Sequence, residues 1–380
     1  MLFSKSIAAA ALLISKAAAT IYYAGVSESS GEFGVWSATS TPGTGLPGRF
    51  GVDYAFINKT AIDVFVDQDH VNLFRVAFLL ERMCPPTTGL GAKFNQTHFD
   101  LYADAINYIT KTKGAYVILD PHNYMRYNDP SQQPMTGSVI GNSTDPKAAT
   151  TKQFAEFWGE LAGRFKGNER VIFGLMNEPH DMSTDLVLAN DQAAIDAIRK
   201  AGAKQLWTGY SPSSATALAN IKDPLNNTAI DIHEYLDADF SGSHVSCNSS
   251  GPANLADVTA WLKANKFKAI VSEFGAANGT QCASYLSDMI NYMASNEEYI
   301  GWAAWAAGPF WGTNSACCSD GNHWGSLEPG STAGDGGPSM YETVWLKEIQ
   351  PLLPKALQWA GVSSVKGGVV SVKGGSHPLV

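Results

Sequence analysis

Residues 171–179 read Val-Ile-Phe-Gly-Leu-Met-Asn-Glu-Pro, an unbroken apolar run that ends in an amide, a carboxylate and a proline. Residues 269–275 repeat this arrangement as Ala-Ile-Val-Ser-Glu-Phe-Gly. A short apolar run without alternation is typical of a parallel strand whose outer side is covered by helices. Each run therefore predicts a buried strand that presents one carboxylate, Glu178 or Glu273, where the strand ends.

Similar apolar runs recur along the chain, with room for a helix between them. Together with the two above they are residues 21–26, 72–78, 116–120, 171–176, 205–209, 229–233, 269–272 and 301–306. Eight such strands are what a closed (β/α)8 barrel, or TIM barrel, needs, and the active site of such a barrel lies at the C-terminal ends of its strands. The pattern predicts one α/β domain over residues 20–360, with Glu178 after the fourth strand and Glu273 after the seventh.

Segments between these runs have the apolar spacing of amphipathic helices. We expect helices at residues 99–113, 152–165, 191–200, 252–264 and 282–294. The end of the chain is different, because Ser-Val-Lys-Gly-Gly occurs at residues 364–368 and again at residues 371–375. Glycine pairs favour a flexible chain, so residues 361–380 are predicted to form a flexible tail.

The composition is that of a packed globular protein, with 45% hydrophobic and 16% charged residues. The net charge of −9 argues against nucleic acid as a partner, because phosphate binding requires basic patches. We found no Gly-rich phosphate loop, no cofactor motif and no cluster with metal-ligand spacing, so neither a cofactor nor a metal is predicted.

The first residues have the pattern of a secretory signal peptide. Lys5 supplies the positive charge, residues 7–14 form a short apolar stretch, and Ala17 to Ala19 offer a small-residue cleavage site. The apolar stretch is too short to cross a bilayer, so residues 1–19 predict secretion and not a membrane anchor.

Two further features are compatible with export. Glycosylation sequons begin at Asn58, Asn95, Asn142, Asn226, Asn248 and Asn278. Five cysteines are compatible with disulfides in an oxidising compartment. The first pairing we expect is Cys247 with Cys282, because both flank the strand of Glu273, and Cys84 is the candidate partner for Cys317 or Cys318.

Two carboxylates at one end of a barrel are the groups that cleavage of a glycosidic bond requires. One acts as an acid on the leaving oxygen, and the other acts at the anomeric carbon. The alternative for either Glu178 or Glu273 is a salt-bridged residue of the core. The buried position of both, at the ends of two strands, favours chemistry.

Several motifs together resemble glycoside hydrolase family 5, and within it the fungal secreted endo-β-1,4-glucanases. They are Gly31-Glu32-Phe33-Gly34, Arg75, Asp120-Pro121-His122-Asn123, Asn177-Glu178-Pro179, His233-Glu234-Tyr235, Ser272-Glu273-Phe274-Gly275 and Trp305-Ala306-Ala307-Gly308-Pro309. The resemblance implies a retaining endoglucanase (cellulase) acting on β-glucan, in which Glu178 is the acid/base and Glu273 the nucleophile.

Three residues around the two carboxylates are predicted to support them. Arg75 interrupts an apolar run, and because a buried guanidinium needs an anion, we expect it to pair with Glu273. The resemblance implies that Asn177 donates a hydrogen bond to the sugar 2-hydroxyl and that Tyr235 steadies Glu273. The alternatives are a structural ion pair, a turn residue before Pro179 and a packed aromatic.

The resemblance also implies residues that contact the sugar chain. His122 and His233 would line the subsite before the cleaved bond, and Trp305 would form its floor. Trp311 would extend that floor, and Trp207 would lie on the leaving-group side, although ordinary packing in the core accounts equally well for these two.

The motifs leave the substrate open among related polysaccharides. β-Mannan and other β-glucans are alternatives to β-1,4-glucan, because loops around the barrel and not the fold decide between them. A non-catalytic glycan-binding protein is a further alternative, which loss of a carboxylate would indicate. We expect a monomer.

Overall fold

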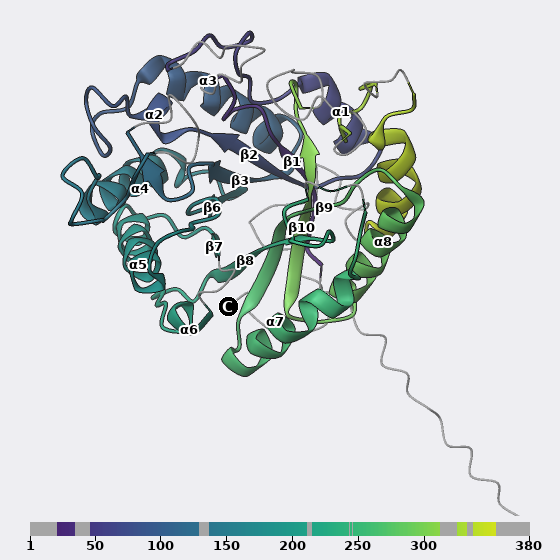
Figure 1. The fold of residues 1–380 in the computed structure, drawn as a ribbon. Helices are drawn as coiled ribbons and strands as arrows, with labels where there is room; N and C mark the ends of the chain where they lie inside the picture. Colours follow the sequence, from purple (N-terminus) through teal and green to yellow (C-terminus); the bar gives the residue numbers. More distant parts are fainter. Residues whose placement is uncertain are drawn as a thin grey trace, which may run out of the picture.

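The protein is described by a computed structural model that covers residues 21–34, 46–128, 137–210, 215–242, 244, 246–311, 325–332 and 337–354. Eight parallel strands close into a barrel in the order β1-β10-β9-β8-β7-β6-β3-β2 (Figure 1). They are β1 (Tyr23–Glu28), β2 (Leu73–Phe78), β3 (Tyr116–Pro121), β6 (Val171–Gly174), β7 (Trp207–Tyr210), β8 (Thr228–Tyr235), β9 (Lys268–Gly275) and β10 (Tyr299–Ala307). The predicted (β/α)8 fold is confirmed.

Helices form the outer layer of this barrel (Figure 1). The longer ones are α1 (Lys59–Asp67), α3 (Gln96–Asn107), α4 (Thr151–Phe165), α5 (Thr184–Lys200), α7 (Gly251–Asn265) and α8 (Thr280–Ala294). The shorter ones are α2 (Leu80–Met83), the π-helices η1 (Tyr108–Thr112) and η2 (Tyr341–Ile349), α6 (Ala215–Leu218) and the 3-10 helix η3 (Gln350–Leu352). Two short strands, β4 (Arg126–Tyr127) and β5 (Ser138–Val139), pair antiparallel beside the barrel.

The helices differ from prediction mainly in where they begin. Helix α5 begins at Thr184 and not at residue 191, because the Ser183 hydroxyl caps it by accepting a hydrogen bond from the N–H of Leu186. Helix α4 matches closely, and Thr150 and Gln153 form a capping box at its start. Helix α1 was not predicted, although Asn58 caps it.

The core has two parts, one inside the barrel and one between the strands and the helices. The residues that fill the inside are Leu73, Tyr116, Ile118, Ile172, Ala229, Ile270, Ile300 and Ala303. The larger cluster packs the outer faces of the strands against the helices. Gly174 permits close strand packing, because a Cβ there would lie 2.8 Å from the Leu119 carbonyl oxygen. The strands are therefore rigid supports for side chains at their C-terminal ends.

Cys247 and Cys282 form the predicted disulfide, with their Cα atoms 5.4 Å apart. Cys84 is a buried free thiol within the described ranges, and its candidate partners Cys317 and Cys318 lie outside those ranges. The predicted signal peptide and the predicted tail also lie outside them. No helix in the described part of the chain is long and apolar enough to cross a membrane.

Candidate active site

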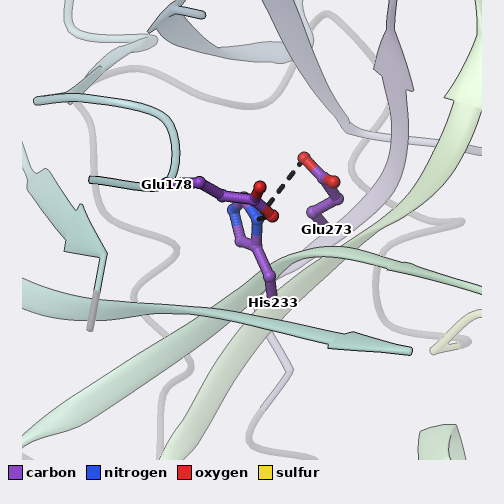
Figure 2. A group of neighbouring side chains, drawn as sticks. All are labelled: Glu178, His233 and Glu273. Carbon is purple, nitrogen blue, oxygen red and sulfur yellow. Dashed lines mark hydrogen bonds and ion pairs between the residues drawn. The ribbon is translucent and has the colours of Figure 1, made fainter. Parts of the chain in front are cut away.

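Glu178 and Glu273 meet at the C-terminal end of the barrel, with His233 between them (Figure 2). One oxygen of each carboxylate and one ring nitrogen of His233 all lie within 4.8 Å of one another. The Nδ1 atom of His233 lies 2.7 Å from Oε1 of Glu178 and 3.5 Å from Oε2 of Glu273. Two residues 95 positions apart in the sequence therefore form one pair, as the strand assignment predicts.

Glu273 is buried and has a donor on each oxygen. The Nη1 atom of Arg75 donates to Oε2 at 2.9 Å, and the hydroxyl of Tyr235 donates to Oε1 at 2.7 Å. Such charge-assisted hydrogen bonds stabilise a carboxylate and fix its orientation. Both contacts were predicted from the sequence, and the structure brings all three residues together.

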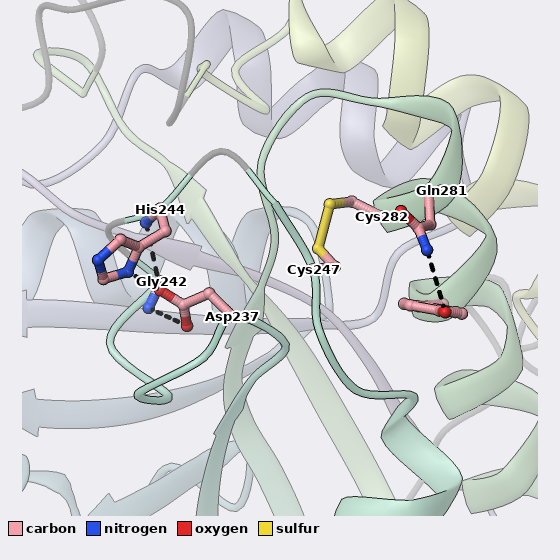
Figure 3. Close-up of a disulfide and its surroundings, with 7 residues drawn as sticks. Asp237, Gly242, His244, Cys247, Gln281 and Cys282 are labelled. Carbon is pink, nitrogen blue, oxygen red and sulfur yellow. Dashed lines mark hydrogen bonds and ion pairs between the residues drawn. A yellow bond between two sulfur atoms is a disulfide. The ribbon is translucent and has the colours of Figure 1, made fainter.

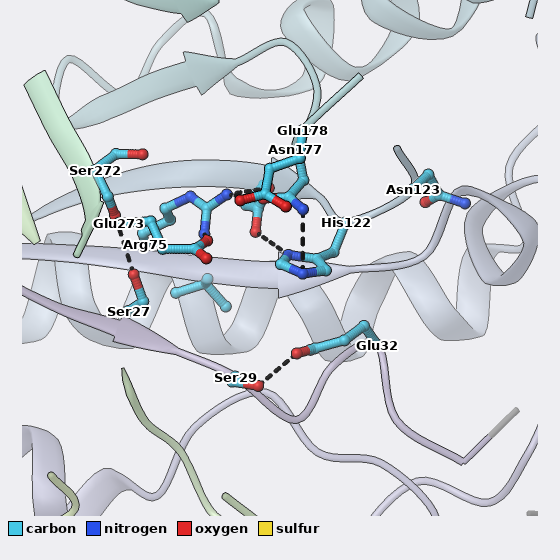
Figure 4. A network of polar contacts seen from close by, with 12 residues as sticks. Ser27, Ser29, Glu32, Arg75, His122, Asn123, Asn177, Glu178, Ser272 and Glu273 are labelled. Carbon is cyan, nitrogen blue, oxygen red and sulfur yellow. Dashed lines mark hydrogen bonds and ion pairs between the residues drawn. The ribbon is translucent and has the colours of Figure 1, made fainter. Parts of the chain in front are cut away.

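Arg75 connects Glu273 to a wider buried network (Figure 4). Its Nη2 atom lies 3.1 Å from Oδ1 of Asp120 and also donates to Oδ1 of Asn177. Burial alone would lower the pKa of Arg75, but the anions Asp120 and Glu273 outweigh burial and raise it. Arg75 is therefore a permanent cation at the base of the site.

Asp120 and Asn177 set the orientation of His122. Nδ1 of His122 lies 2.9 Å from Oδ2 of Asp120. Burial disfavours a charged imidazole, but the carboxylate of Asp120 outweighs it and raises the pKa of His122 to about 9. Since Arg75 holds the amide oxygen of Asn177, the amide nitrogen faces Nε2 of His122 at 3.2 Å. The amide donor opposes a proton on Nε2, whereas the carboxylate of Asp120 favours the charged ring, and in either state Nδ1 carries the proton that faces Asp120.

Glu178 has a different environment from Glu273. Its side chain is 30% exposed, and its one described hydrogen bond is with His233. Burial raises the pKa of Glu178. The neighbours His122 and Arg75 oppose this shift, whereas Asp120 adds to it. Its backbone φ of +35° is unusual for a residue with a side chain, and such conformations are concentrated at functional sites. The surroundings of Glu178 therefore favour its protonated form.

His233 faces both carboxylates, and its side chain is buried among acidic groups. Burial lowers the pKa of His233, although Glu273 and Asp231 oppose this shift. Its neutral form has one N–H to donate, and the short contact from Nδ1 to Glu178 is where that proton fits best. The tautomer is inferred from these contacts.

Trp305 closes the site on the side of β10. Its indole stacks on the His122 ring with centroids 5.4 Å apart and lies 5.9 Å from the Arg75 guanidinium. Because Trp305 is only partly buried, one aromatic surface is left for a ligand such as a sugar ring. Trp305 therefore lies beside the carboxylate site, and its role as the floor of a sugar subsite stays a prediction.

Two predicted aromatic contacts do not reach the site directly. Trp311 is 3% exposed and packs edge-on behind Trp305, with centroids 5.2 Å apart, so it supports the floor and does not extend it. Trp207 is 1% exposed, because it is the first residue of β7 and points into the outer core, where its indole donates to Asp223. The packing alternative is therefore correct for Trp207.

Asp120 and Tyr124 also belong to the site, although no role was predicted for either from the sequence. Asp120 holds Arg75 and His122, and it is the last residue but one of β3, so its place beside Pro121 and His122 was the available indication. Tyr124 packs edge-on against His122, with centroids 5.5 Å apart, from a turn with a φ of +53°. No pattern in the sequence indicates that turn.

The described residues contain two groups whose oxygen and nitrogen atoms converge as metal ligands would. One is Glu178, His233 and Glu273, and the other is Asp237, Asp239 and His244 in the loop after β8. Figure 3 shows Asp237 and His244 of this second group. In both, short hydrogen bonds between members already satisfy the groups. The expectation of no metal and no cofactor therefore stays a prediction.

A (β/α)8 barrel that presents a close pair of carboxylates at its C-terminal end has the architecture of a glycoside hydrolase. A family model described as cellulase (glycosyl hydrolase family 5) matches residues 28–310. The chain therefore belongs to glycosyl hydrolase family 5, as its motifs indicated.

Individual relatives agree with this assignment. Endoglucanase 1 of Robillarda sp. (strain Y-20) is 68% identical over 373 residues, covering 95% of this chain and 97% of that protein. Probable endo-β-1,4-glucanase B of Aspergillus oryzae is 35% identical over 76% of this chain and 82% of its own length. A solved structure of XacCel5A in complex with cellopentaose is 31% identical, with a TM-score of 0.71 over 89% of this chain and 99% of that one.

Proposed function

We propose that the protein is a secreted, monomeric endo-β-1,4-glucanase that cleaves internal bonds of β-glucan with retention of configuration. The observation that carries the mechanism is the distance between the carboxylates, with oxygen atoms of Glu178 and Glu273 within 4.8 Å of each other. Retaining enzymes hold their two carboxyl groups about 5 Å apart, whereas inverting enzymes need a wider gap for a water molecule.

Glu273 is the nucleophile in this proposal. Arg75 and Tyr235 hold both of its oxygens, so the carboxylate is ionised and aimed before substrate arrives. In the first step an oxygen of Glu273 forms a bond to the anomeric carbon while the bond to the leaving oxygen breaks. Glu178, protonated, gives its proton to that leaving oxygen.

Glu178 then reverses its role. Having lost its proton, it accepts one from a water molecule, which attacks the anomeric carbon and releases Glu273. Burial raises the pKa of Glu178, so the acid form needed first is available, and partial exposure leaves a path for the water. His233 contacts both carboxylates and positions Glu178 for either role.

Asn177, His122 and Trp305 bind the sugar on the nucleophile's side. Asn177 is locked between Arg75 and His122, so its amide is held in place to contact the 2-hydroxyl, a contact that strengthens in the transition state. Trp305 offers the surface on which a pyranose ring stacks. The preference for β-1,4-glucan rests on the names of the relatives, an endoglucanase of Robillarda and a probable endo-β-1,4-glucanase of Aspergillus oryzae.

Secretion is supported by the pattern of residues 1–19 and by the disulfide between Cys247 and Cys282, since such bonds persist in oxidising compartments. Four sequon asparagines, Asn58, Asn226, Asn248 and Asn278, are exposed and thus open to glycosylation.

Two measurements test the proposal. The first is release of reducing ends from carboxymethyl cellulose, barley β-glucan, glucomannan, mannan and laminarin. We expect the first two to lead, whereas a lead by mannan or laminarin would overturn the substrate and keep the chemistry. The second is proton NMR of the first product from a cello-oligosaccharide. Initial formation of the β-anomer supports retention, and initial formation of the α-anomer contradicts it.

A further inference from the structure

A polar layer lies inside the barrel, below the carboxylate pair. It consists of Thr208 on β7, Asp231 on β8 and Ser272 on β9, and all three residues are buried. Two residues earlier on β8 and β9, Ala229 and Ile270 belong to the apolar filling of the barrel. Burial of polar groups costs free energy unless they are hydrogen-bonded, and the proposed mechanism gives these three residues no role.

Ser272 reaches the barrel interior because β9 has a β-bulge. Val271 pairs with Ile232 of β8, and the next pair along the two strands is Glu273 with His233. Ser272 is therefore an extra residue on β9. In a regular strand neighbouring side chains point to opposite faces, so Ser272 would face the helices while Glu273 faces the site. The bulge turns both side chains inward, and bulges beside active sites often re-aim a side chain in this way.

The hydroxyl of Ser272 lies against the ring nitrogen of His233 that faces away from Glu178. The Oγ atom of Ser272 is 3.4 Å from Nε2 of His233, whereas Nδ1 is 2.7 Å from Oε1 of Glu178. A neutral imidazole has one N–H donor and one bare acceptor nitrogen. When Nδ1 carries the proton, Nε2 is the acceptor, and the Ser272 hydroxyl donates to it.

Asp231 favours the opposite placement of that proton. Its Oδ1 atom lies 3.9 Å from Nε2 of His233 and has no hydrogen-bond partner among the described residues, whereas Oδ2 accepts a hydrogen bond from Thr208 at 3.3 Å. Burial raises the pKa of Asp231, although His233 and Arg75 oppose this shift, so its carboxylate gains from any nearby proton. A proton on Nε2 would serve Oδ1 and leave Nδ1 bare toward Glu178.

The two placements have opposite effects on the acid. With the proton on Nδ1, His233 donates to Oε1 of Glu178, and the proton of Glu178 stays on its other oxygen, free for the leaving oxygen. With the proton on Nε2, the bare Nδ1 accepts the proton of Glu178 and withholds it from the substrate. The tautomer of His233 therefore decides whether Glu178 works as an acid.

We propose that Ser272 is a positioning residue that keeps the proton of His233 on Nδ1 against the pull of Asp231. Glu178 thereby stays able to protonate the leaving group. The inference rests on the proposed function, in which Glu178 is the acid. It also gives the bulge of β9 a task, because in a regular strand the Ser272 hydroxyl would point away from His233.

The test compares two substrates that differ in their need for an acid. Cellotetraose has a sugar leaving group that must be protonated, whereas dinitrophenyl β-cellobioside has a leaving group that departs unaided. The ratio of the two kcat/KM values is measured, because kcat/KM reports the first chemical step and any general loss of active protein cancels in the ratio.

The variants are Ser272→Ala, Asp231→Asn and the double variant. Ser27→Ala is the matched control, because Ser27 is a buried serine on β1 whose hydroxyl donates to the carbonyl oxygen of Ser272 at 3.2 Å (Figure 4). It removes a buried hydroxyl of the same size and leaves the Ser272 hydroxyl beside His233.

We expect Ser272→Ala to lower kcat/KM for cellotetraose about tenfold, which is the effect of one hydrogen bond, and to leave the value for the dinitrophenyl substrate within about twofold. Asp231→Asn should keep the wild-type ratio. In the double variant it should restore that ratio, because the amide carries no negative charge and offers an N–H to Nε2. Ser27→Ala should keep the wild-type ratio.

Nitrogen NMR of protein with isotope-labelled histidine measures the tautomer directly, since protonated and bare ring nitrogens have well separated shifts. The signals of His233 are those missing from the spectrum of His233→Gln. We expect the proton on Nδ1 in the wild type and on Nε2 in Ser272→Ala.

Four results would overturn the inference. They are an equal loss on both substrates in Ser272→Ala, no loss on either, a double variant without recovery, and a wild type with the proton of neutral His233 on Nε2. No turnover of either substrate by the wild type would instead refute the proposed function.

Discussion

Glu178 and Glu273 are the same residue type, and their neighbours make them chemically different. Arg75 and Tyr235 take both oxygens of Glu273, whereas Glu178 is partly exposed and has a pKa raised by burial. Two carboxyl groups whose environments differ in this way take opposite roles, one as the anion and one as the acid.

Replacing either carboxylate should abolish most turnover. We expect Glu178→Gln and Glu273→Gln each to lower kcat on a cello-oligosaccharide by about 10³-fold or more, because each removes a group that moves a proton or forms a bond. Steady-state kinetics measures this loss, and circular dichroism should show an intact fold. Activity within tenfold of the wild type in either variant would remove that residue from its role.

Smaller replacements combined with azide distinguish the two roles. With an aryl cellobioside whose leaving group needs no acid, Glu178→Ala should recover turnover in azide and give the β-glycosyl azide, since Glu273 still forms the intermediate. Glu273→Ala should give the α-azide, since the anion then attacks directly. The opposite stereochemistry would exchange the two assignments.

Tyr235 is predicted to act through Glu273. Tyr235→Phe keeps the ring and removes the hydrogen bond of 2.7 Å to Oε1. A hydrogen bond to a charged group contributes about 1.5–3 kcal/mol, so kcat should fall by about 10- to 100-fold. The same change at Tyr285, which lies on α8 and is partly buried, is the control and should leave kcat near that of the wild type. An equal loss in both variants would show that Tyr235 acts only through stability.

At the scale of single residues the sequence predicts well where the side chains of the candidate site lie, because a motif directly after a strand fixes both the place and the direction of its side chains. Glu178, Glu273 and Arg75 are such residues. The prediction that Trp207 contacts the sugar was wrong. The sequence did not show that the strand begins at this residue, at the end of the barrel away from the site. Tyr124 was missed because its position depends on an irregular turn.

At the scale of elements, the end of β1 and the segment at Glu328 share a buried acidic pair. Glu28 is fully buried, and its carboxylate oxygens have no hydrogen-bond partner among the described residues. Glu328 accepts a hydrogen bond from the N–H of Gly308, just after β10. Burial, together with Glu328, raises the pKa of Glu28, and burial raises the pKa of Glu328 to about 7. Burial therefore favours the protonated form of both carboxyl groups.

This pair should make stability fall as pH rises. A carboxyl group with a raised pKa in the folded state contributes stability that is fully present below its unfolded pKa near 4.5 and is lost as pH rises through about 7. Glu328→Gln keeps an acceptor for Gly308 and removes the titration. Between pH 5 and pH 8 the free energy of unfolding should fall for both proteins. We expect the fall to be smaller for Glu328→Gln than for the wild type, by about 3 kcal/mol.

Urea unfolding at the two pH values measures this difference. Glu297→Gln, at an exposed position, is the matched control and should follow the wild type. An identical pH dependence in Glu328→Gln and the wild type would show that the buried pair does not titrate in this range.

The disulfide joins the loop after β8 to the first turn of α8 across 35 residues of sequence. Closing a loop of that length stabilises a protein by about 3–4 kcal/mol in the chain-entropy model. The double variant Cys247→Ala, Cys282→Ala should therefore have a lower Tm by scanning calorimetry. The wild type in reducing agent should approach the same Tm, and an unchanged Tm in both would contradict a stabilising role.

Prediction of the elements succeeded for the strands and was less complete for the helices. Buried parallel strands carry continuous apolar runs, which are visible in the sequence. Helix α1 has only a few buried positions, and the first turns of α5 depend on a cap at Ser183, so their patterns are weaker. The shortness of α6 is a property of packing around β8, which the sequence does not reveal.

At the scale of the whole molecule, the barrel brings groups from six strands to one site. Arg75 comes from β2, Asp120 from β3, Tyr235 from β8, Glu273 from β9 and Trp305 from β10, and Glu178 follows β6. No local segment holds more than a fraction of this network, so the network forms only when the barrel closes. Activity should therefore be lost together with the fold. We expect pH to act on activity through Glu178 and on stability through Glu328.

The pH profile of kcat/KM should be a bell whose alkaline side is set by Glu178. Glu178 must hold a proton to act as the acid, so the rate is retained below its pKa, which burial raises, and is lost as pH rises through it. The rate should also fall on the acidic side, because the mechanism needs its nucleophile as an anion. Glu328→Gln should change the pH dependence of unfolding and leave the alkaline side of the kinetic profile in place, because Glu328 does not contact the carboxylate pair. If Glu328→Gln shifted both the pH profile of unfolding and that of kcat/KM, the loss of activity at high pH would result from unfolding and not from titration of Glu178.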